Sequence, residues 1–191
     1  MTKLTPRFAS ALAYAFEVHS GQERKGTDIP YVSHLLGVTA IALENGATED
    51  EAMAALLHDA PEDAGGAPIL DEIRNRFGPA VSDIVAGCSD TFETPKPLWR
   101  KRKEAYIAHL EGASASVLLV SASDKLHNVR SITSDYRVIG ETVWERFMGG
   151  REGTLWYYRA MADSFLRLSR NRLASELDLA VQELERLAVR R

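Results

Sequence analysis

The sequence predicts an all-α protein, folded as a single bundle of about eight to ten helices. Apolar residues recur every three or four positions along most of the chain, which is the spacing of one face of a helix. Strict alternation of apolar and polar residues, which indicates a half-buried strand, is absent over any useful length. At a mean helix length of about 11–12 residues, a chain of 191 residues accommodates that number of helices.

Five helices are expected in the first half of the chain, each with its own apolar stripe. In chain order the stripes are Phe8, Leu12, Ala15, Phe16 and His19; Leu35, Val38, Ile41 and Ala42; Met53, Leu56 and Leu57; Ile69, Ile73 and Phe77; and Val81, Ile84, Val85 and Cys88. Gly21, Gly46 and the Gly78-Pro79 pair end three of these helices. Thr48, with Glu51 three residues later, predicts a capping box at the start of the third helix.

A polar loop from Thr91 to Pro97 separates these helices from the second half. Further helices are expected at residues 99–108, 114–132, 140–150, 153–170 and 173–187. The apolar run from Val117 to Val120 also suits a buried strand, but the chain offers no second run to pair with it, so a helix is favoured. The leucine stripe of the last helix suits packing on its own core or on a partner, and the oligomeric state therefore stays open.

Composition excludes several classes of protein. A hydrophobic fraction of 45% and a charged fraction of 26% are those of a folded domain. No run approaches the roughly 18 apolar residues of a membrane helix, and the N-terminus lacks the apolar segment of a secretory signal. The single cysteine, Cys88, forms no internal disulfide or thiolate zinc cluster, and the net charge of −4 argues against nucleic acid as a partner. We therefore expect a cytoplasmic protein with neither a nucleic-acid nor a membrane partner.

The segment from Leu56 to Asp63 interrupts the apolar pattern with four ionisable side chains. They are His58, Asp59, Glu62 and Asp63. Three carboxylates so close together repel one another, and a divalent cation would relieve that repulsion. Pro61 removes a helical hydrogen bond and predicts a kink or a helix end at this point. The alternative interpretation is a solvated acidic helix end.

A second polar segment follows the apolar run that ends at Val120. Asp124 is expected inside or at the mouth of the core, where a carboxylate needs a cation or a metal as partner. Asn128 lies four residues on and shares its helix face, whereas His127 lies beside them, about 100° from Asn128, and is expected to pack or to face solvent. The alternative for Asp124 is an ion pair with a nearby lysine or arginine.

A third segment places two cations and a glycine, Arg24-Lys25-Gly26, in a loop that suits anion binding. His34 then opens the next helix, where a capping or core histidine is the alternative interpretation. Taken together, two imidazoles and two carboxylates form a mixed nitrogen and oxygen site; they are His34, His58, Asp59 and Asp124. Such a set suits manganese, iron or zinc better than calcium. A metal that activates water needs a general base nearby, and Glu62 and Asp63 are the candidates.

These residues resemble the signature of the HD-domain metal-dependent phosphohydrolases, His34, then His58-Asp59, then Asp124. With the flanking segments, the resemblance narrows to the hydrolase domain of RelA/SpoT homologues. Those segments are Arg24-Lys25-Gly26, Pro30 to His34, Leu56 to Asp63, Phe77-Gly78 and Asp124 to Asn128. The similarity runs from about Ala9 to Ile132 and continues more weakly to about residue 170.

The resemblance implies one HD-type domain over residues 1–191, with its core signature at 24–132 and C-terminal helices at 140–191. It implies removal of the 3′-pyrophosphate of the alarmone (p)ppGpp, or of its adenosine analogue (p)ppApp, as in a stand-alone small alarmone hydrolase. The products would be pyrophosphate and the 5′-nucleotide. The preference for guanosine or adenosine is left open.

The resemblance also assigns roles to individual residues. One manganese ion, or another divalent transition metal, would be held by His34, His58, Asp59 and Asp124. Glu62 and Asp63 match the pair that positions and activates the attacking water. Contacts to the nucleotide would come from Arg24, Lys25 and Asn128, to phosphate from Lys96, and across the closed site from Trp156 and Tyr157. Core packing is an equally good interpretation of these last two aromatic residues.

Two other functions are compatible with the sequence. The first is an HD-type nucleotidase acting on a deoxynucleotide or on a nicotinamide cofactor phosphate such as NADPH. The loop cations and the Glu62-Asp63 pair argue against it, because simple monophosphate hydrolysis does not require them. The second is a non-catalytic alarmone sensor, which is disfavoured because the chain carries all four ligand residues.

Overall fold

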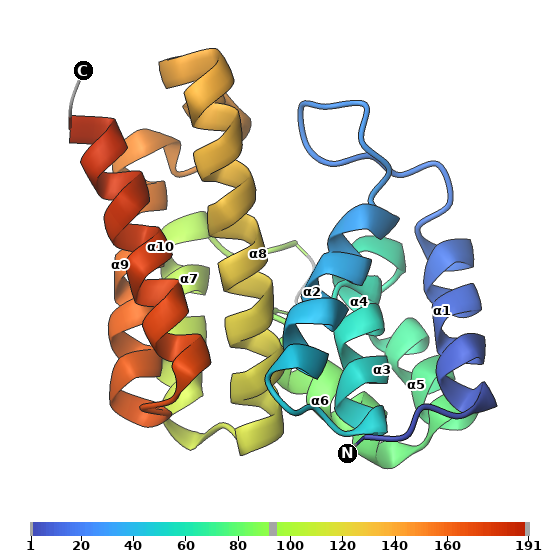
Figure 1. Ribbon diagram of the computed structural model, residues 1–191. Helices are drawn as coiled ribbons and strands as arrows, with labels where there is room; N and C mark the ends of the chain where they lie inside the picture. The colour runs from blue at the N-terminus through green and yellow to red at the C-terminus, as the bar shows by residue number, and fades with distance from the viewer. Residues whose placement is uncertain (1, 92–94, 190–191) are drawn as a thin grey trace.

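The computed structural model describes residues 2–91 and 95–189, and the regular structure in these ranges is helical apart from one isolated bridge between Glu23 and Pro30. Within these ranges, ten α-helices and two 3₁₀ helices follow one another, and Figure 1 shows their arrangement. In order they are α1 (Pro6–Val18), α2 (Val32–Glu44), α3 (Glu49–Leu57), α4 (Ala60–Ala64), α5 (Ala67–Phe77), α6 (Pro79–Cys88), α7 (Trp99–His109), η1 (Leu110–Gly112), α8 (Ala115–Ile139), η2 (Gly140–Arg146), α9 (Gly150–Leu168) and α10 (Arg172–Val189). The predicted all-α fold is confirmed.

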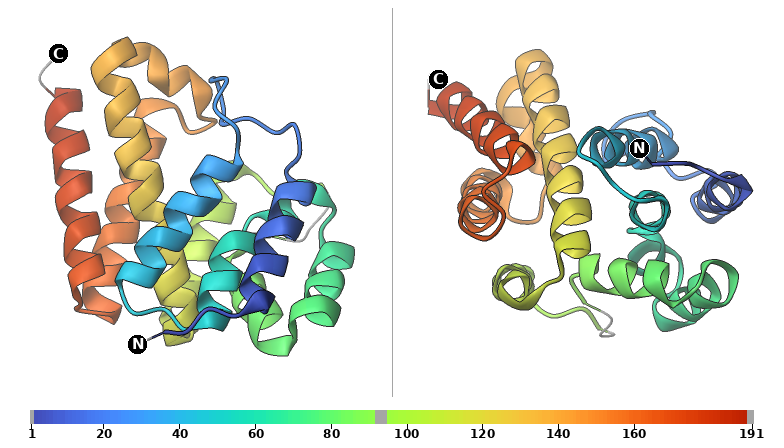
Figure 2. Two further views of the ribbon diagram at one scale, coloured as in Figure 1. Left: turned by 45° about the vertical axis from the view of Figure 1, so that its right-hand side comes forward. Right: turned by 60° about the horizontal axis from the view of Figure 1, so that its bottom comes forward.

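The helices form two groups on either side of α8 (Figures 1 and 2), and each group surrounds a hydrophobic cluster to which α8 contributes side chains. Helices α1 to α6 surround the first cluster, and α7, α9 and α10 surround the second. Val117 and Val120, near the start of α8, belong to the first cluster, whereas Leu126 and Val129 farther along belong to the second. Helix α8 therefore carries its side chains into the boundary between the two clusters.

Helix α8 settles the ambiguity of the apolar run at Val117 to Val120, which is helical. The side chain of Ser114 accepts a hydrogen bond from the backbone N–H of Val117 and so caps the first turn. The helix continues to Ile139 rather than ending at Ile132 as expected, and it ends where Gly140 takes a positive φ of 61°. The segment expected as a helix at residues 140–150 then begins with the 3₁₀ helix η2.

The predicted break near Pro61 is present. Thr48 and Glu51 form the expected capping box at the start of α3, which ends at Leu57. Helix α4 begins at Ala60 with Pro61 in its first turn, where a missing N–H costs nothing. His58 and Asp59 therefore lie between the end of α3 and the start of α4, and not on the face of either helix.

Phe16 does not belong to the core, contrary to the expected stripe of the first helix. The buried face of α1 is centred on Ala11, Tyr14 and Ala15, and Phe16 is 59% exposed. Successive residues of a helix point about 100° apart, so the side chain after Ala15 turns away from the core.

No helix in the described part of the chain is both long enough and apolar enough to cross a bilayer.

Candidate functional site

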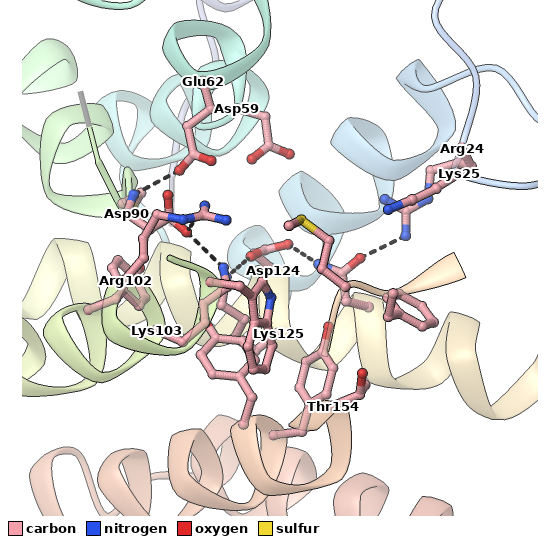
Figure 3. A pocket seen from close by; sticks show the side chains of 18 of the residues that line it. Arg24, Lys25, Asp59, Glu62, Asp90, Arg102, Lys103, Asp124, Lys125 and Thr154 are labelled. Carbon is pink, nitrogen blue, oxygen red and sulfur yellow. Dashed lines mark hydrogen bonds and ion pairs between the residues drawn. The ribbon is translucent and has the colours of Figure 1, made fainter. Parts of the chain in front are cut away.

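A cavity of about 330 Å³ lies where α8 faces α4, α7, α9 and the loop at residues 19–31 (Figure 3). Two groups of side chains of opposite character border it. We call the first the ligand wall, formed by His34, His58, Asp59 and Asp124, of which the two carboxylates line the cavity. We call the second the cation wall, formed by Arg102, Lys103 and Lys125.

The ligand wall brings together all four residues that the sequence predicts as metal ligands. His34 comes from the first turn of α2 and His58 from the end of α3, and both are buried. The Nε2 atom of His34 lies 3.4 Å from Asp59 Oδ2 and 3.3 Å from Asp124 Oδ1. The Nε2 atom of His58 lies 3.1 Å and 3.6 Å from the same two oxygens. Two nitrogens and two carboxylate oxygens from three parts of the chain thus converge on one point.

Neither Nε2 atom in the ligand wall makes a hydrogen bond, although both are buried. A buried polar atom without a partner is costly unless something in the site satisfies it. One atom from each of His34, His58 and Asp59 lies within 4.8 Å of the others, close enough to share a cation. Two imidazole nitrogens with carboxylate oxygens suit a divalent transition metal better than calcium or magnesium. The residues present therefore fit such a metal.

The charges of the ligand wall also favour a cation. Burial would lower the pKa of His58, but the carboxylates of Asp59 and Asp124 outweigh it and raise that pKa well above its ordinary value. Burial raises the pKa of the two carboxyls, but nearby cationic groups, His58 for Asp59 and Lys125 for Asp124, hold each pKa well below its usual range. Both carboxylates are therefore ionised and face the imidazoles.

Each residue of the ligand wall is oriented by a neighbour. His58 Nδ1 lies 2.9 Å from the carbonyl oxygen of Ala55 and donates to it, which leaves Nε2 as the free ring nitrogen. The hydroxyl of Tyr31 donates to Asp59 Oδ2 at 2.7 Å, and the amide of Asn128 donates to Asp124 Oδ1 at 2.5 Å. The predicted pairing of Asp124 with Asn128 on one helix face is thus present.

His127 lies beside His34 rather than in solvent. Its Nδ1 is 2.9 Å from His34 Nδ1, and the two rings meet edge to face. Burial and the neighbouring His34 and Arg24 lower the pKa of His127 to about 4, so the ring is neutral at pH 7. No local pattern connects His127 with His34, because the two residues lie on different helices and are 93 positions apart in the chain.

The side chains of Glu62 and Asp63 have different surroundings: Glu62 lines the cavity, and Asp63 contacts Gln22. Glu62 lines the cavity, and its Oε1 accepts a hydrogen bond of 2.7 Å from the backbone N–H of Asp90. Burial and the charge of Asp90 raise the pKa of Glu62 above its ordinary value. Asp63 instead accepts a 2.8 Å hydrogen bond from Gln22 and lies 3.9 Å from His19 Nδ1. Because neighbouring helix residues diverge by about 100°, only Glu62 reaches the cavity of the ligand wall.

The loop at residues 19–31 brings Arg24 and Lys25 into the lining of the cavity. Arg24 Nη2 donates to Asn128 Oδ1 at 2.7 Å, so all three expected nucleotide-contacting residues lie together. A second cavity of about 550 Å³ adjoins the first, since Arg24, Lys25 and Asn128 line both. A ligand with two charged ends could occupy both cavities.

Sequence reasoning missed the cation wall. Arg102 and Lys103 of α7 both contact Asp90 Oδ2, at 2.5 and 2.8 Å, and Lys125 of α8 contacts Asp124. The side chain of Asp90 is only 5% exposed. The feature of the sequence that could have indicated it is a spacing of three and four residues, which places side chains on one face of a helix. The residues with this spacing all line the cavity; they are Trp99, Arg102, Lys103 and Tyr106. Within a run of charged residues, the sequence alone does not distinguish this face from solvated helix surface.

The three remaining candidates for substrate contact differ in whether they line the cavity: Tyr157 does, whereas Lys96 and Trp156 do not. Lys96 is exposed, with Nζ 3.5 Å from the backbone oxygen of Glu62, and it does not line the cavity. Residues 92–94 of the same predicted loop lie outside the described part of the chain. Tyr157 lines the cavity, and its buried hydroxyl has no hydrogen-bond partner there. Trp156 lies instead against the guanidinium of Arg100, 3.2 Å from the ring centre, and outside the cavity lining.

Known proteins resemble this chain in sequence and in structure. The family model for the HD domain matches residues 11–155. The guanosine-3′,5′-bis(diphosphate) 3′-pyrophosphohydrolase MESH1 of Drosophila melanogaster is 33% identical over 129 residues, 66% of this chain and 69% of that protein. The bifunctional (p)ppGpp synthase/hydrolase SpoT of Escherichia coli K12 is 30% identical over 134 residues, 67% of this chain but only 18% of SpoT. A solved structure described as a metazoan ortholog of SpoT that hydrolyses ppGpp matches with a TM-score of 0.76 and 28% identity, covering 97% of both chains.

Proposed function

This chain belongs to the HD-domain family, and we propose that it is a metal-dependent phosphohydrolase that removes the 3′-pyrophosphate of (p)ppGpp. The observation that carries the proposal is the convergence of two unpartnered buried Nε2 atoms, from His34 and His58, on the carboxylates of Asp59 and Asp124. Relatives named for this reaction support the choice of substrate. The catalytic unit would be the domain at residues 1–191, because both hydrophobic clusters contribute to the cavity.

The four residues of the ligand wall would hold one divalent ion, and we propose manganese. Their two nitrogens and two carboxylate oxygens suit manganese, iron and zinc alike, so the identity of the ion is a question for metal analysis. When bound, such an ion acts as a Lewis acid and lowers the pKa of water.

Glu62 is the proposed general base. Its carboxylate lines the cavity and is fixed by the backbone of Asp90, while its raised pKa suits a group that must accept a proton near neutral pH. Glu62 would take the proton of the water that attacks the 3′-linked phosphorus. The bond between that phosphorus and the 3′-oxygen breaks as the bond to the water oxygen forms, and the 3′-oxygen takes up the proton that Glu62 accepted. Pyrophosphate and the nucleotide with its free 3′-hydroxyl group are then released. Asp63 is no longer an equal candidate, since its carboxylate is directed to Gln22.

The cation wall is the proposed site for the pyrophosphate group. In the structure Asp90 balances the charge of Arg102 and Lys103. A highly charged phosphate group entering the cavity would share these cations with Asp90, and the hydroxyl of Tyr157 offers a further hydrogen bond. Arg24, Lys25 and Asn128 would hold the rest of the nucleotide at the rim.

The decisive experiment measures pyrophosphate release from ppGpp and from ppApp side by side, with Mn²⁺ and with a chelator. Release that depends on the metal is the expected result, and the ratio of the two rates gives the purine preference. Metal-loaded protein that releases no pyrophosphate from either substrate, but hydrolyses NADPH or a deoxynucleotide, would contradict the proposal.

A further inference from the structure

The two histidines of the ligand wall differ in the group that contacts their Nδ1 atoms. His58 is oriented by Ala55, a backbone carbonyl of its own helix at 2.9 Å. His34 is oriented by a side chain from another helix, since its Nδ1 lies 2.9 Å from Nδ1 of His127 on α8. The backbone partner is present whatever the sequence, whereas the side-chain partner depends on one residue.

We propose that His127 is a positioning residue that fixes the orientation of the His34 ring and the nitrogen on which His34 carries its proton. We also propose that residue 37 is glycine because the His127 ring occupies the space that a side chain there would need. The inference rests on the proposed metal site, because it concerns how one of its ligands is held. The contact of His127 with His34 is through Nδ1, not through the Nε2 atom that lies beside the carboxylates.

The proton assignment follows from the distance. Two ring nitrogens at 2.9 Å are in hydrogen-bond contact only if one of them carries a proton. If His34 uses Nε2 toward the metal, its proton is on Nδ1, and His34 donates to His127. His127 Nδ1 is then the acceptor, and its own proton is on Nε2. Metal-binding histidines commonly donate their second ring nitrogen in this way, and the acceptor fixes the tautomer.

Gly37 supports the assignment independently. It lies on α2, three residues after His34, and its φ is not in the left-handed region, so its backbone does not require glycine. A Cβ at this position would lie 2.2 Å from Cδ2 and 2.3 Å from Nε2 of His127. Any side chain at residue 37 would therefore displace the His127 ring from His34.

Helix α8 combines these functions within little more than one turn. Asp124 is a ligand, Asn128 holds Asp124 through a 2.5 Å hydrogen bond, and His127 holds His34. The helix therefore orients a ligand of its own and a ligand of α2. A shift of α8 would move both at once.

The test uses metal-free full-length protein and measures Mn²⁺ affinity by the electron paramagnetic resonance signal of free Mn²⁺. His127→Phe keeps an aromatic ring without an acceptor and should weaken binding by about 10–100-fold. His127→Asn places an oxygen near the former Nδ1 and should restore most of the affinity. Gly37→Ala should weaken binding as His127→Phe does. Gly112→Ala is the matched control, since a Cβ there meets nothing within 4 Å.

A second measurement reports the proton directly in the unaltered protein. In ¹⁵N-histidine-labelled protein loaded with Zn²⁺, long-range proton–nitrogen correlations should show His34 protonated at Nδ1. This result does not depend on whether any variant folds. Thermal unfolding of the metal-free variants separates a loss of fold from a loss of affinity.

The outcomes distinguish this inference from the proposed function. Unchanged Mn²⁺ affinity in His127→Phe, equal weakening in His127→Asn, or a His34 proton on Nε2 would each overturn the role of His127. His34→Ala provides the reference. If it loses Mn²⁺ while His127→Phe keeps it, only the inference fails; if it also keeps Mn²⁺, the metal site itself is wrong.

Discussion

The two walls of the cavity are built on opposite principles. The ligand wall uses three side chains at helix ends and Asp124 from within α8, and fixed neighbours such as Tyr31, Asn128 and Ala55 orient them. The cation wall uses the long side chains of Arg102 and Lys103, whose partner in the structure is a single carboxylate, Asp90. Ligand atoms held in fixed positions suit one tightly bound ion. The cations of Arg102 and Lys103, in contrast, can turn from Asp90 to an incoming phosphate group. The comparison predicts that the first wall governs turnover and the second governs binding.

The largest effect should come from removing a ligand. His58→Ala or Asp59→Ala should lose bound metal and lower activity by at least about 10³-fold, because several kcal/mol of transition-state stabilisation depend on the ion. Metal analysis of the purified variants and the rate of pyrophosphate release test this together. A variant with a full complement of metal and an ordinary rate would remove that residue from the ligand wall.

Glu62→Gln should come next and should separate metal binding from chemistry. The variant should keep its metal but lose about 10²–10⁴-fold in kcat, the usual contribution of a general base. Burial and the charge of Asp90 raise the pKa of Glu62, so kcat of the unaltered enzyme should rise as pH increases through that raised value and the carboxyl ionises. The pH profile of Glu62→Gln should lack this acidic limb.

Asp63→Asn is the matched control for Glu62. Its carboxylate accepts a hydrogen bond from Gln22 and does not line the cavity at the ligand wall, so the change should cost far less than Glu62→Gln. Equal losses in the two variants would restore the pair as a catalytic unit.

Lys103→Met should change binding rather than chemistry. A hydrogen bond to a charged group contributes about 1.5–3 kcal/mol, which corresponds to an increase in KM of about tenfold to a hundredfold. Lys101→Met is the control on the same helix, since Lys101 is exposed and does not line the cavity. A fall in kcat with unchanged KM for Lys103→Met would show that the two walls do not divide their tasks.

The smallest effects should distinguish the two neighbouring aromatic residues. Tyr157→Phe removes an unpartnered hydroxyl from the cavity and should raise KM by roughly two- to tenfold, the equivalent of one neutral hydrogen bond. Trp156→Phe should leave KM unchanged, because Trp156 contacts Arg100 outside the cavity. Steady-state kinetics of both variants decide the point, and a reversed order would assign the substrate contact to Trp156.

The part of the site that was predicted from sequence depends on local patterns. His58 and Asp59 interrupt an apolar stripe, and Asp124 follows one, so each stands out against its own helix. The apolar periodicity likewise predicted the helices, while the 3₁₀ form of η2 depends on the local geometry after Gly140, which periodicity does not report.

Contacts between segments that are far apart in the chain could not be predicted from the sequence. Arg102 and Lys103 become a binding wall only because α7 packs beside Asp90, and His127 matters only because α2 lies against α8. A charged run and a lone histidine have no such meaning before the helices are assembled. The same holds for Asp63, whose neighbour Gln22 comes from the loop at residues 19–31.

The position of α8 has a consequence for how the molecule unfolds. The helix shares its apolar side chains between both hydrophobic clusters and carries Asp124 between them, while His34 and His58 come from the first cluster's helices. An ion bound by all three residues therefore favours the state in which both clusters are intact. Its binding free energy adds to the stability of the whole chain. Amide hydrogen exchange in α9 and α10 should slow when metal binds, although neither helix supplies a ligand.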